Sequence, residues 1–139
     1  MNNSALTTSP IDYQTLGAFR AALRKFLRMS EAIAGNFGLT PQQHQMLLVV
    51  RGFLGKDEPA VGILARRLQI RHNSAVGLIN RLVKLRLVRR ISDKQDRRLV
   101  KVVLTAKGLK VLDKLTLAHQ TELAQIGPEI RKLLTTLQY

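Results

Sequence analysis

The hydrophobic period of this chain changes from helical to strand-like and back again, and this pattern limits the folds the chain can adopt. Apolar residues recur at helical spacing in the first part of the chain and again after residue 105. Between these parts, residues 87–91 are rich in branched side chains. Residues 97–104 alternate and place three apolar residues on one face, Val100, Val102 and Leu104. Two short strands around a polar turn predict a hairpin, which must pack on helices because an isolated hairpin is marginal in water. We therefore predict a mainly α protein with a small β-hairpin (α+β).

Signals for helix ends divide the helical parts into segments. Ser9-Pro10 is typical of a cap followed by a first helical residue, and it predicts a long helix that ends near Gly35. Thr40 and Gln43 have the spacing of a capping box, so a second helix should start there and stop at Gly52.

The middle of the chain predicts two shorter helices with a break over residues 69–73. The first has the core residues Ile63, Leu64 and Leu68. The second runs to about Arg86, and its inner side holds five apolar residues, Ala75, Leu78, Ile79, Leu82 and Leu85.

The end of the chain predicts two further helices. Thr105 should cap the first of them, and Gly127-Pro128 should break it, because proline lacks the amide donor of a helix interior. The last helix would carry Ile130, Leu133, Leu134 and Leu137. The apolar faces of the terminal helices either complete the core of one monomer or pack against a second copy. We favour a second copy, because symmetric pairs are the commonest oligomers.

Composition excludes several classes of function. The 139 residues suffice for one compact domain, and the absence of cysteine excludes disulfides, thiolate zinc sites and cysteine nucleophiles. No apolar run approaches a membrane span and the N-terminus lacks a secretory pattern, so we expect a cytoplasmic protein. The three histidines and nine acids form no catalytic or metal motif, so we expect neither an enzyme nor a cofactor. RNA binding is disfavoured because only 4% of the residues are aromatic.

The positive charge of the chain is concentrated in one segment. The net charge is +14, and residues 60–107 hold 13 Lys and Arg against two acids, Asp93 and Asp96. A surface adapted only for solubility would intersperse both signs. A concentrated positive segment instead indicates a phosphate-rich partner, which we take to be double-stranded DNA.

The order helix, turn, helix, hairpin is that of a winged helix-turn-helix, whose second helix reads the major groove. Here the start and outer face of that helix hold Arg71, His72, Asn73, Ser74, Val76, Gly77, Asn80 and Arg81. Arg suits guanine and Asn suits adenine by two-pronged hydrogen bonds. His72 is expected to face solvent or phosphate. Ser74 is either a DNA contact or a helix cap, and Gly77 would let the helix approach DNA closely.

The predicted hairpin tip carries Lys94, Arg97 and Arg98. An arginine on a thin tip can enter the minor groove, where the negative potential is strongest. Asp96 is an acid within this basic cluster. It either performs ordinary turn chemistry or orients Arg98 by a charge-assisted hydrogen bond.

The segments Asp93–Arg98 and Val103–Gly108 resemble the wing and the following helix start of the MarR family of bacterial transcriptional regulators. The resemblance implies a homodimer joined by its first and last helices, a palindromic operator and, usually, repression. It implies a recognition helix in the major groove and Arg98 in the minor groove, steadied by Asp96. It also implies release of DNA when a small anionic or phenolic ligand binds. Gln69 and Arg86 depart from the family pattern, which has glycine at these turns.

These inferences give one domain over residues 1–139. Residues 10–35 and 105–139 would form a helical dimerisation region, and residues 40–104 the winged helix-turn-helix. A ligand pocket would lie between the two regions, near Phe19, Arg20 or His44. Two functions stay open, a sequence-specific regulator controlled by a small anionic or aromatic effector, and an architectural, nucleoid-type DNA-binding protein of low sequence specificity.

Overall fold

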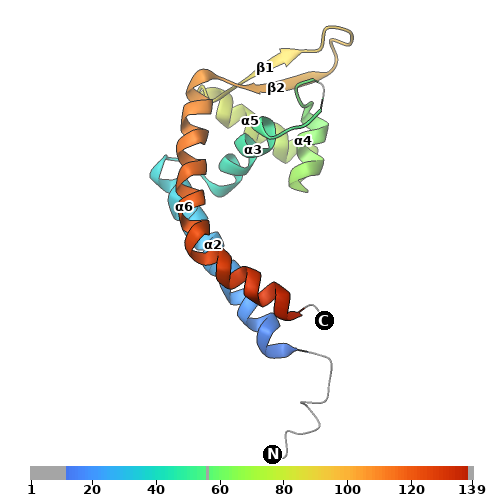
Figure 1. The fold of residues 1–139 in the computed structure, drawn as a ribbon. Coiled ribbons are helices and arrows are strands. Elements are labelled where there is room, and N and C mark those ends of the chain that lie inside the picture. Colours follow the sequence, from blue (N-terminus) through green and yellow to red (C-terminus); the bar gives the residue numbers. More distant parts are fainter. Residues whose placement is uncertain (1–11, 56, 138–139) are drawn as a thin grey trace, which may run out of the picture. The chain divides into compact units, whose positions relative to one another are not determined.

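The computed structural model describes residues 12–55 and 57–137 (Figure 1). The elements of these residues follow the order α2 (Tyr13–Asn36), α3 (Pro41–Arg51), α4 (Val61–Leu68), α5 (His72–Lys84), β1 (Val88–Ser92), β2 (Val100–Leu104) and α6 (Ala106–Leu137). A mainly helical fold with one hairpin is therefore confirmed. The predicted cap at Ser9-Pro10 lies outside the described residues. Asp12 precedes α2, and its Oδ1 accepts a hydrogen bond from the Thr15 amide at 2.9 Å.

The chain divides into two compact units. The helical unit comprises residues 12–30 and 119–137, and the winged unit comprises residues 31–118. In the helical unit, the Oγ of Ser30 lies 2.7 Å from the Nε2 of buried His119, and the Phe26 ring meets the same imidazole edge-on. None of the described helices combines the length and the apolarity that a membrane crossing requires.

The winged unit is built around one hydrophobic core. Its largest fully buried side chains come from α3, α4, α5, β1, β2 and α6, and they are Met46, Leu47, Leu64, Ile79, Leu82, Val88, Val102 and Leu115. Val100 and Leu104 pack against this core, so the predicted inward face of the second strand is confirmed. Leu85 was expected on the inner side of its helix and is 40% exposed instead, because α5 ends at Lys84 and Leu85 is the residue that follows its last turn.

The hairpin is antiparallel, with Val88 opposite Leu104 and Ser92 opposite Val100. The second strand begins at Val100 rather than at Arg97, because the amide of Asp93 donates to the carbonyl of Leu99 at 3.0 Å and closes the tip as a turn. A short bridge between Ala60 and Lys101 attaches the hairpin to the segment before α4.

Helix α3 starts and ends as the sequence predicts. The Gln43 amide donates to Thr40 Oγ1 at 3.2 Å, and the Thr40 amide donates to Gln43 Oε1 at 3.0 Å, which is the reciprocal pattern of a capping box. Gly52 ends the helix.

Gln69 and Arg86 stand where the family pattern has glycine, and both keep the left-handed backbone conformation that glycine favours. Gln69 has φ 55° and Arg86 has φ 61°, and both follow the ends of helices, α4 and α5 respectively. The turns are therefore formed by non-glycine residues in the left-handed region, where a β-carbon is unfavourable.

The predicted helix break at Gly127-Pro128 is wrong, because α6 is continuous and contains Pro128. Pro128 removes one backbone hydrogen bond, but the apolar stripe stays in phase across it. Ile126 is buried, and Ile130, Leu133 and Leu137 are half-buried at the spacing of one helix face. Burial on both sides of the proline therefore outweighs its local cost.

Candidate DNA-binding surface

The start of α5 is exposed and has no side-chain cap. Arg71 occupies the N-cap position with φ −68° and ψ 152°, and no side chain accepts a hydrogen bond from the first-turn amides. Ser74 is the third residue of the helix, so the interpretation of Ser74 as a simple cap is wrong. Arg71, His72, Asn73 and Ser74 are all exposed. An uncapped helix start leaves amide donors that suit a phosphate oxygen.

Four of the predicted residues on α5 line one concavity. Its volume is about 270 Å³, and its walls include Asn73, Ser74, Gly77 and Arg81. A β-carbon at position 77 would meet nothing within 4 Å, so this side of the helix is open. The absence of a side chain at Gly77 therefore gives space for a partner rather than for packing within the chain.

Asn80 has a partner that the sequence did not indicate. The Nη2 of Arg90, on β1, donates a hydrogen bond to Asn80 Oδ1. A guanidinium has donors and no acceptor, so the carbonyl end of the Asn80 amide must face Arg90 and its NH2 group must face elsewhere. The contact joins residues from two different elements, and no short motif marks it in the sequence.

A second concavity brings α5 and the wing together. Its volume is about 320 Å³, and its lining includes His72, Val76, Arg90, Arg98 and Leu99. His72 and Arg98 were both predicted site residues, from the helix and from the hairpin tip. The winged unit therefore places them around one hollow.

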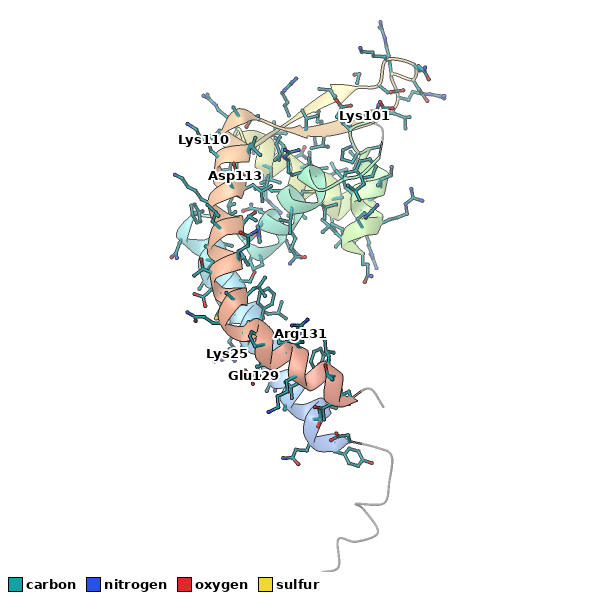
Figure 2. The ribbon with its side chains drawn as sticks, in the orientation of Figure 1. Lys25, Lys101, Lys110, Asp113, Glu129 and Arg131 are labelled. Atoms are coloured by element: carbon teal, nitrogen blue, oxygen red, sulfur yellow. The ribbon has the colours of Figure 1, made fainter. Side chains whose placement is uncertain are left out.

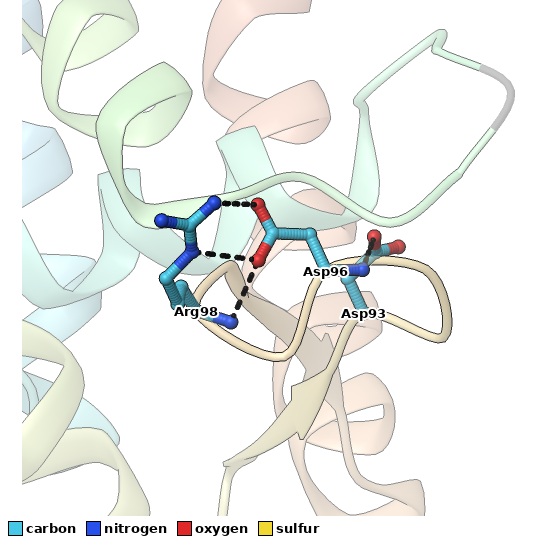
Figure 3. A network of polar contacts seen from close by, with 3 residues as sticks. All are labelled: Asp93, Asp96 and Arg98. Carbon is cyan, nitrogen blue, oxygen red and sulfur yellow. Dashed lines mark hydrogen bonds and ion pairs between the residues drawn. The ribbon is translucent and has the colours of Figure 1, made fainter.

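The wing tip holds Arg98 by its neighbour Asp96 (Figure 3). Asp96 Oδ1 accepts from the Arg98 amide and from Arg98 Nε, both at 3.1 Å, and Oδ2 lies 3.5 Å from Nη2. The Arg98 side chain is 92% exposed. The aspartate therefore orients an arginine that points into solvent. Lys94 and Arg97 are exposed on the same tip.

Both aspartates of the tip stabilise the turn, because Asp93 adds a side-chain hydrogen bond to the one that Asp96 accepts from the Arg98 amide. Asp93 Oδ2 accepts a hydrogen bond from the Asp96 amide at 2.9 Å, and Asp93 Oδ1 forms an ion pair with Lys101 Nζ at 2.8 Å. The Lys101 hydrogen bond, followed by that of the Asp96 amide, lowers the pKa of Asp93 below 3.8. The same bond to Asp93 raises the pKa of Lys101 above 10.5. Sequence reasoning counted Lys101 among the charges for DNA and missed this pairing.

Side chains at the start of α6 donate hydrogen bonds to the backbone carbonyls that follow α5. The Thr105 hydroxyl donates to the Arg86 carbonyl at 2.6 Å and accepts from the Gly108 amide at 3.0 Å, which confirms Thr105 as the cap. Lys107 Nζ donates to the Leu85 carbonyl at 3.1 Å. The run Leu104-Thr105 with Gly108 thus joins the end of α5 and the hairpin to the start of α6.

Residues 37–99, from the end of α2 to the wing tip, match the sequence model of the MarR family. This segment, just under half of the chain, is therefore similar to the MarR family. Members of that family are transcription regulators, and the sequence likewise predicts no enzyme. No curated protein sequence matched the chain.

Solved MarR-type structures share the fold of nearly the whole chain. MepR, a transcription regulator of the Staphylococcus aureus multidrug efflux pump MepA, superposes with a TM-score of 0.74 at 21% identity, over 92% of this chain and 100% of MepR. A MepR–DNA complex from S. aureus gives 0.66 at 23% identity, over 87% and 98% of the two chains. YusO of Bacillus subtilis gives 0.66 at 18% identity, over 90% and 83%. The MarR-type winged-helix fold is therefore common to all of them.

Proposed function

We propose that this MarR-type chain is a homodimeric transcriptional repressor that binds a palindromic operator in a sequence-specific manner. The winged unit binds DNA, and the helical unit joins the two copies. A small anionic or aromatic ligand lowers the affinity of the dimer for DNA.

The observation that carries the proposal is the exposed arginine at the wing tip. Arg98 is held by Asp96 through its backbone amide and its guanidinium, while most of its side chain stays in solvent. An isolated surface ion pair contributes little to stability, so such a pair is better explained as orientation of the arginine toward a partner. The partner that suits a fixed, exposed guanidinium on a thin tip is the minor groove of DNA.

The recognition helix supports the same partner. Its uncapped start, its open Gly77 and its exposed Arg71, Asn73 and Arg81 offer donors for both phosphates and base edges. The MepR–DNA complex is evidence that a chain of this fold can bind DNA.

Exposed apolar residues support pairing of two copies through the helical unit. Tyr13 is 72% exposed, and Leu16, Leu27, Leu123 and Leu134 are between 41% and 53% exposed. Monomeric proteins seldom leave extended apolar surface in water, and a two-fold operator requires a two-fold protein.

Selection of bound fragments from random duplex DNA tests the proposal. We expect recovery of a palindrome whose half-sites are about 10 base pairs apart, and a preference over random DNA of roughly 10³-fold or more. Arg98→Ala should weaken operator binding strongly and leave the dimer intact. Arg131→Ala, which removes one positive charge from the helical unit (Figure 2), is the matched control and should bind as the wild type does.

Other outcomes of these experiments assign other functions. Equal affinity for all sequences would identify an architectural DNA-binding protein. If the Arg98→Ala variant binds the operator as tightly as the wild type does, the wing tip does not contact DNA through Arg98. Titration of aromatic carboxylates into the operator complex tests the ligand, and we expect release of the DNA.

A further inference from the structure

We propose that Lys101 positions the wing tip for DNA binding and does not itself contact DNA. The inference rests on the proposed DNA-binding function and adds to it a residue that acts through Asp93 and Asp96. Figure 2 labels Lys101 on β2, at the base of the hairpin tip.

Lys101 differs from the other basic residues of its segment. Of the 13 Lys and Arg in residues 60–107, twelve are exposed, while the Lys101 side chain keeps only 12% of its surface in solvent. Its Nζ lies 2.8 Å from Asp93 Oδ1 and 3.7 Å from Asp57 Oδ2. The charge of this ammonium is compensated by the Asp93 carboxylate, and Lys101 could reach a phosphate only by breaking that ion pair.

Asp93 links Lys101 to the residues of the hairpin tip. One carboxylate oxygen of Asp93 forms the ion pair with the Lys101 ammonium, and the other accepts a hydrogen bond from the Asp96 amide at 2.9 Å. The Asp96 carboxylate in turn holds the Arg98 guanidinium. A continuous series of polar contacts therefore runs from Lys101 through Asp93 and Asp96 to Arg98.

The backbone of Lys101 provides a fixed base for this series. Lys101 pairs with Ile91 across the hairpin and bridges to Ala60, and the next amide, that of Val102, donates to the Pro59 carbonyl at 3.0 Å. Val102 is fully buried in the core of the winged unit. The tip is thus attached to the core through Lys101 rather than through the exposed residues of the tip.

Loss of the ammonium should loosen the tip without removing a DNA contact. Asp93 is 18% exposed, and without Lys101 its carboxylate would turn toward water and release the Asp96 amide. Arg98 would then have to be ordered when DNA binds. Ordering one mobile side chain corresponds to an affinity loss of about 3- to 10-fold.

The salt dependence of binding separates a positioning lysine from a phosphate contact. Each phosphate contact adds about 0.9 to the slope of log K against log salt concentration. We expect Lys101→Met to lower operator affinity about 3- to 10-fold with an unchanged slope. Lys94→Met, which removes an exposed lysine from the same tip, should reduce the slope by roughly 1. Asp93→Asn should resemble Lys101→Met, and the double variant should lose no more than either single variant.

Amide hydrogen exchange tests the inference without DNA. We expect the Asp96 and Arg98 amides to exchange faster in Lys101→Met than in the wild type, with unchanged exchange in α3 and α5. Lys101→Arg keeps the ion pair and should retain slow exchange and full affinity. It also serves as the second variant, should the methionine variant fail to fold.

Three results would overturn the inference. They are wild-type affinity of the Lys101→Met variant, a slope reduced as in Lys94→Met, and unaltered exchange at the tip. A wild type that does not bind duplex DNA would instead refute the proposed function, and the exchange measurement would still decide whether Lys101 orders the tip.

Discussion

The carbonyl oxygen of Leu87 occupies the place that a side chain at Gly108 would need. A β-carbon on residue 108 would lie 1.9 Å from that oxygen and 2.8 Å from the Leu87 carbonyl carbon. Both contacts are with backbone, which cannot rotate away as a side chain can. Glycine at this position therefore allows the first turn of α6 to approach the start of the hairpin.

Gly108→Ala should destabilise the fold, although alanine normally favours a helix by about 1 kcal/mol over glycine. The clash with Leu87 must move α6 away from the hairpin, and we expect a loss of about 1–3 kcal/mol in the free energy of unfolding. Gly62→Ala is the control, because a β-carbon at Gly62 on α4 would meet nothing within 4 Å. Urea unfolding of both variants checks the prediction, which fails if Gly108→Ala is as stable as the control.

Arg71→Ala or Asn73→Ala should relax base preference at one operator position by about 1–3 kcal/mol. Both side chains are exposed at the start of α5, where a recognition helix meets base edges. Competition binding with operators substituted at single positions provides the measurement. An equal loss of affinity on every sequence would assign these residues to phosphates instead.

The Arg90–Asn80 contact predicts which end of the Asn80 amide meets DNA. Asn80→Asp keeps an oxygen for Arg90 and removes the NH2 donor, so it should preserve the fold and weaken operator binding. Arg90→Met frees the amide to rotate, and we expect altered preference at the base step that faces Asn80. Selection of operators by each variant compares the two. If Arg90→Met selects the wild-type operator unchanged, the contact has no role in recognition.

Gln69→Gly and Arg86→Gly should each stabilise the winged unit or leave its stability unchanged. Both residues have positive φ, which costs a residue with a β-carbon about 1–2 kcal/mol, while glycine loses about 0.5–1 kcal/mol through its more flexible unfolded state. Leu85→Gly, at a right-handed position beside Arg86, is the control and should destabilise. Thermal unfolding of the three variants measures the difference. If Gln69→Gly and Arg86→Gly destabilise the protein as much as the control does, the backbone at these two residues is not strained.

The ion pair of Asp93 predicts a pH dependence of stability. The pKa of Asp93 is lowered in the folded state by Lys101 and the Asp96 amide, so its contribution is present above the unfolded pKa of about 3.8 and is lost as the pH falls through the folded pKa. The wild type should therefore unfold at a higher temperature than Asp93→Asn at pH 7, and the difference should shrink below pH 4. Asp113→Asn on α6 is the control. A difference that is constant from pH 7 to pH 2 would exclude the ion pair as its source.

Elements with local signals could be predicted from the sequence. The capping box of Thr40 and Gln43, the stop at Gly52 and the cap at Thr105 each involve residues within three or four positions of a helix end. The alternation of Val100, Val102 and Leu104 predicted their burial for the same reason, since the side chains of a strand alternate between two faces. The charge of the segment and the wing motif also indicated a DNA-binding surface, because both can be read along the chain.

The wing network and the path of α6 could not be predicted in this way. Lys101 pairs with Asp93 and Asp57, and Arg90 bonds Asn80, across turns that bring distant residues together. Pro128 should end a helix by local rules, yet burial of the residues around it keeps α6 intact. The order of amino acids determined where helices begin, which strand face is apolar and where the charge gathers, because these depend on neighbours in the chain. Only the folded arrangement decided which charged side chains stay exposed and which are paired within the wing, because pairing depends on distance in space.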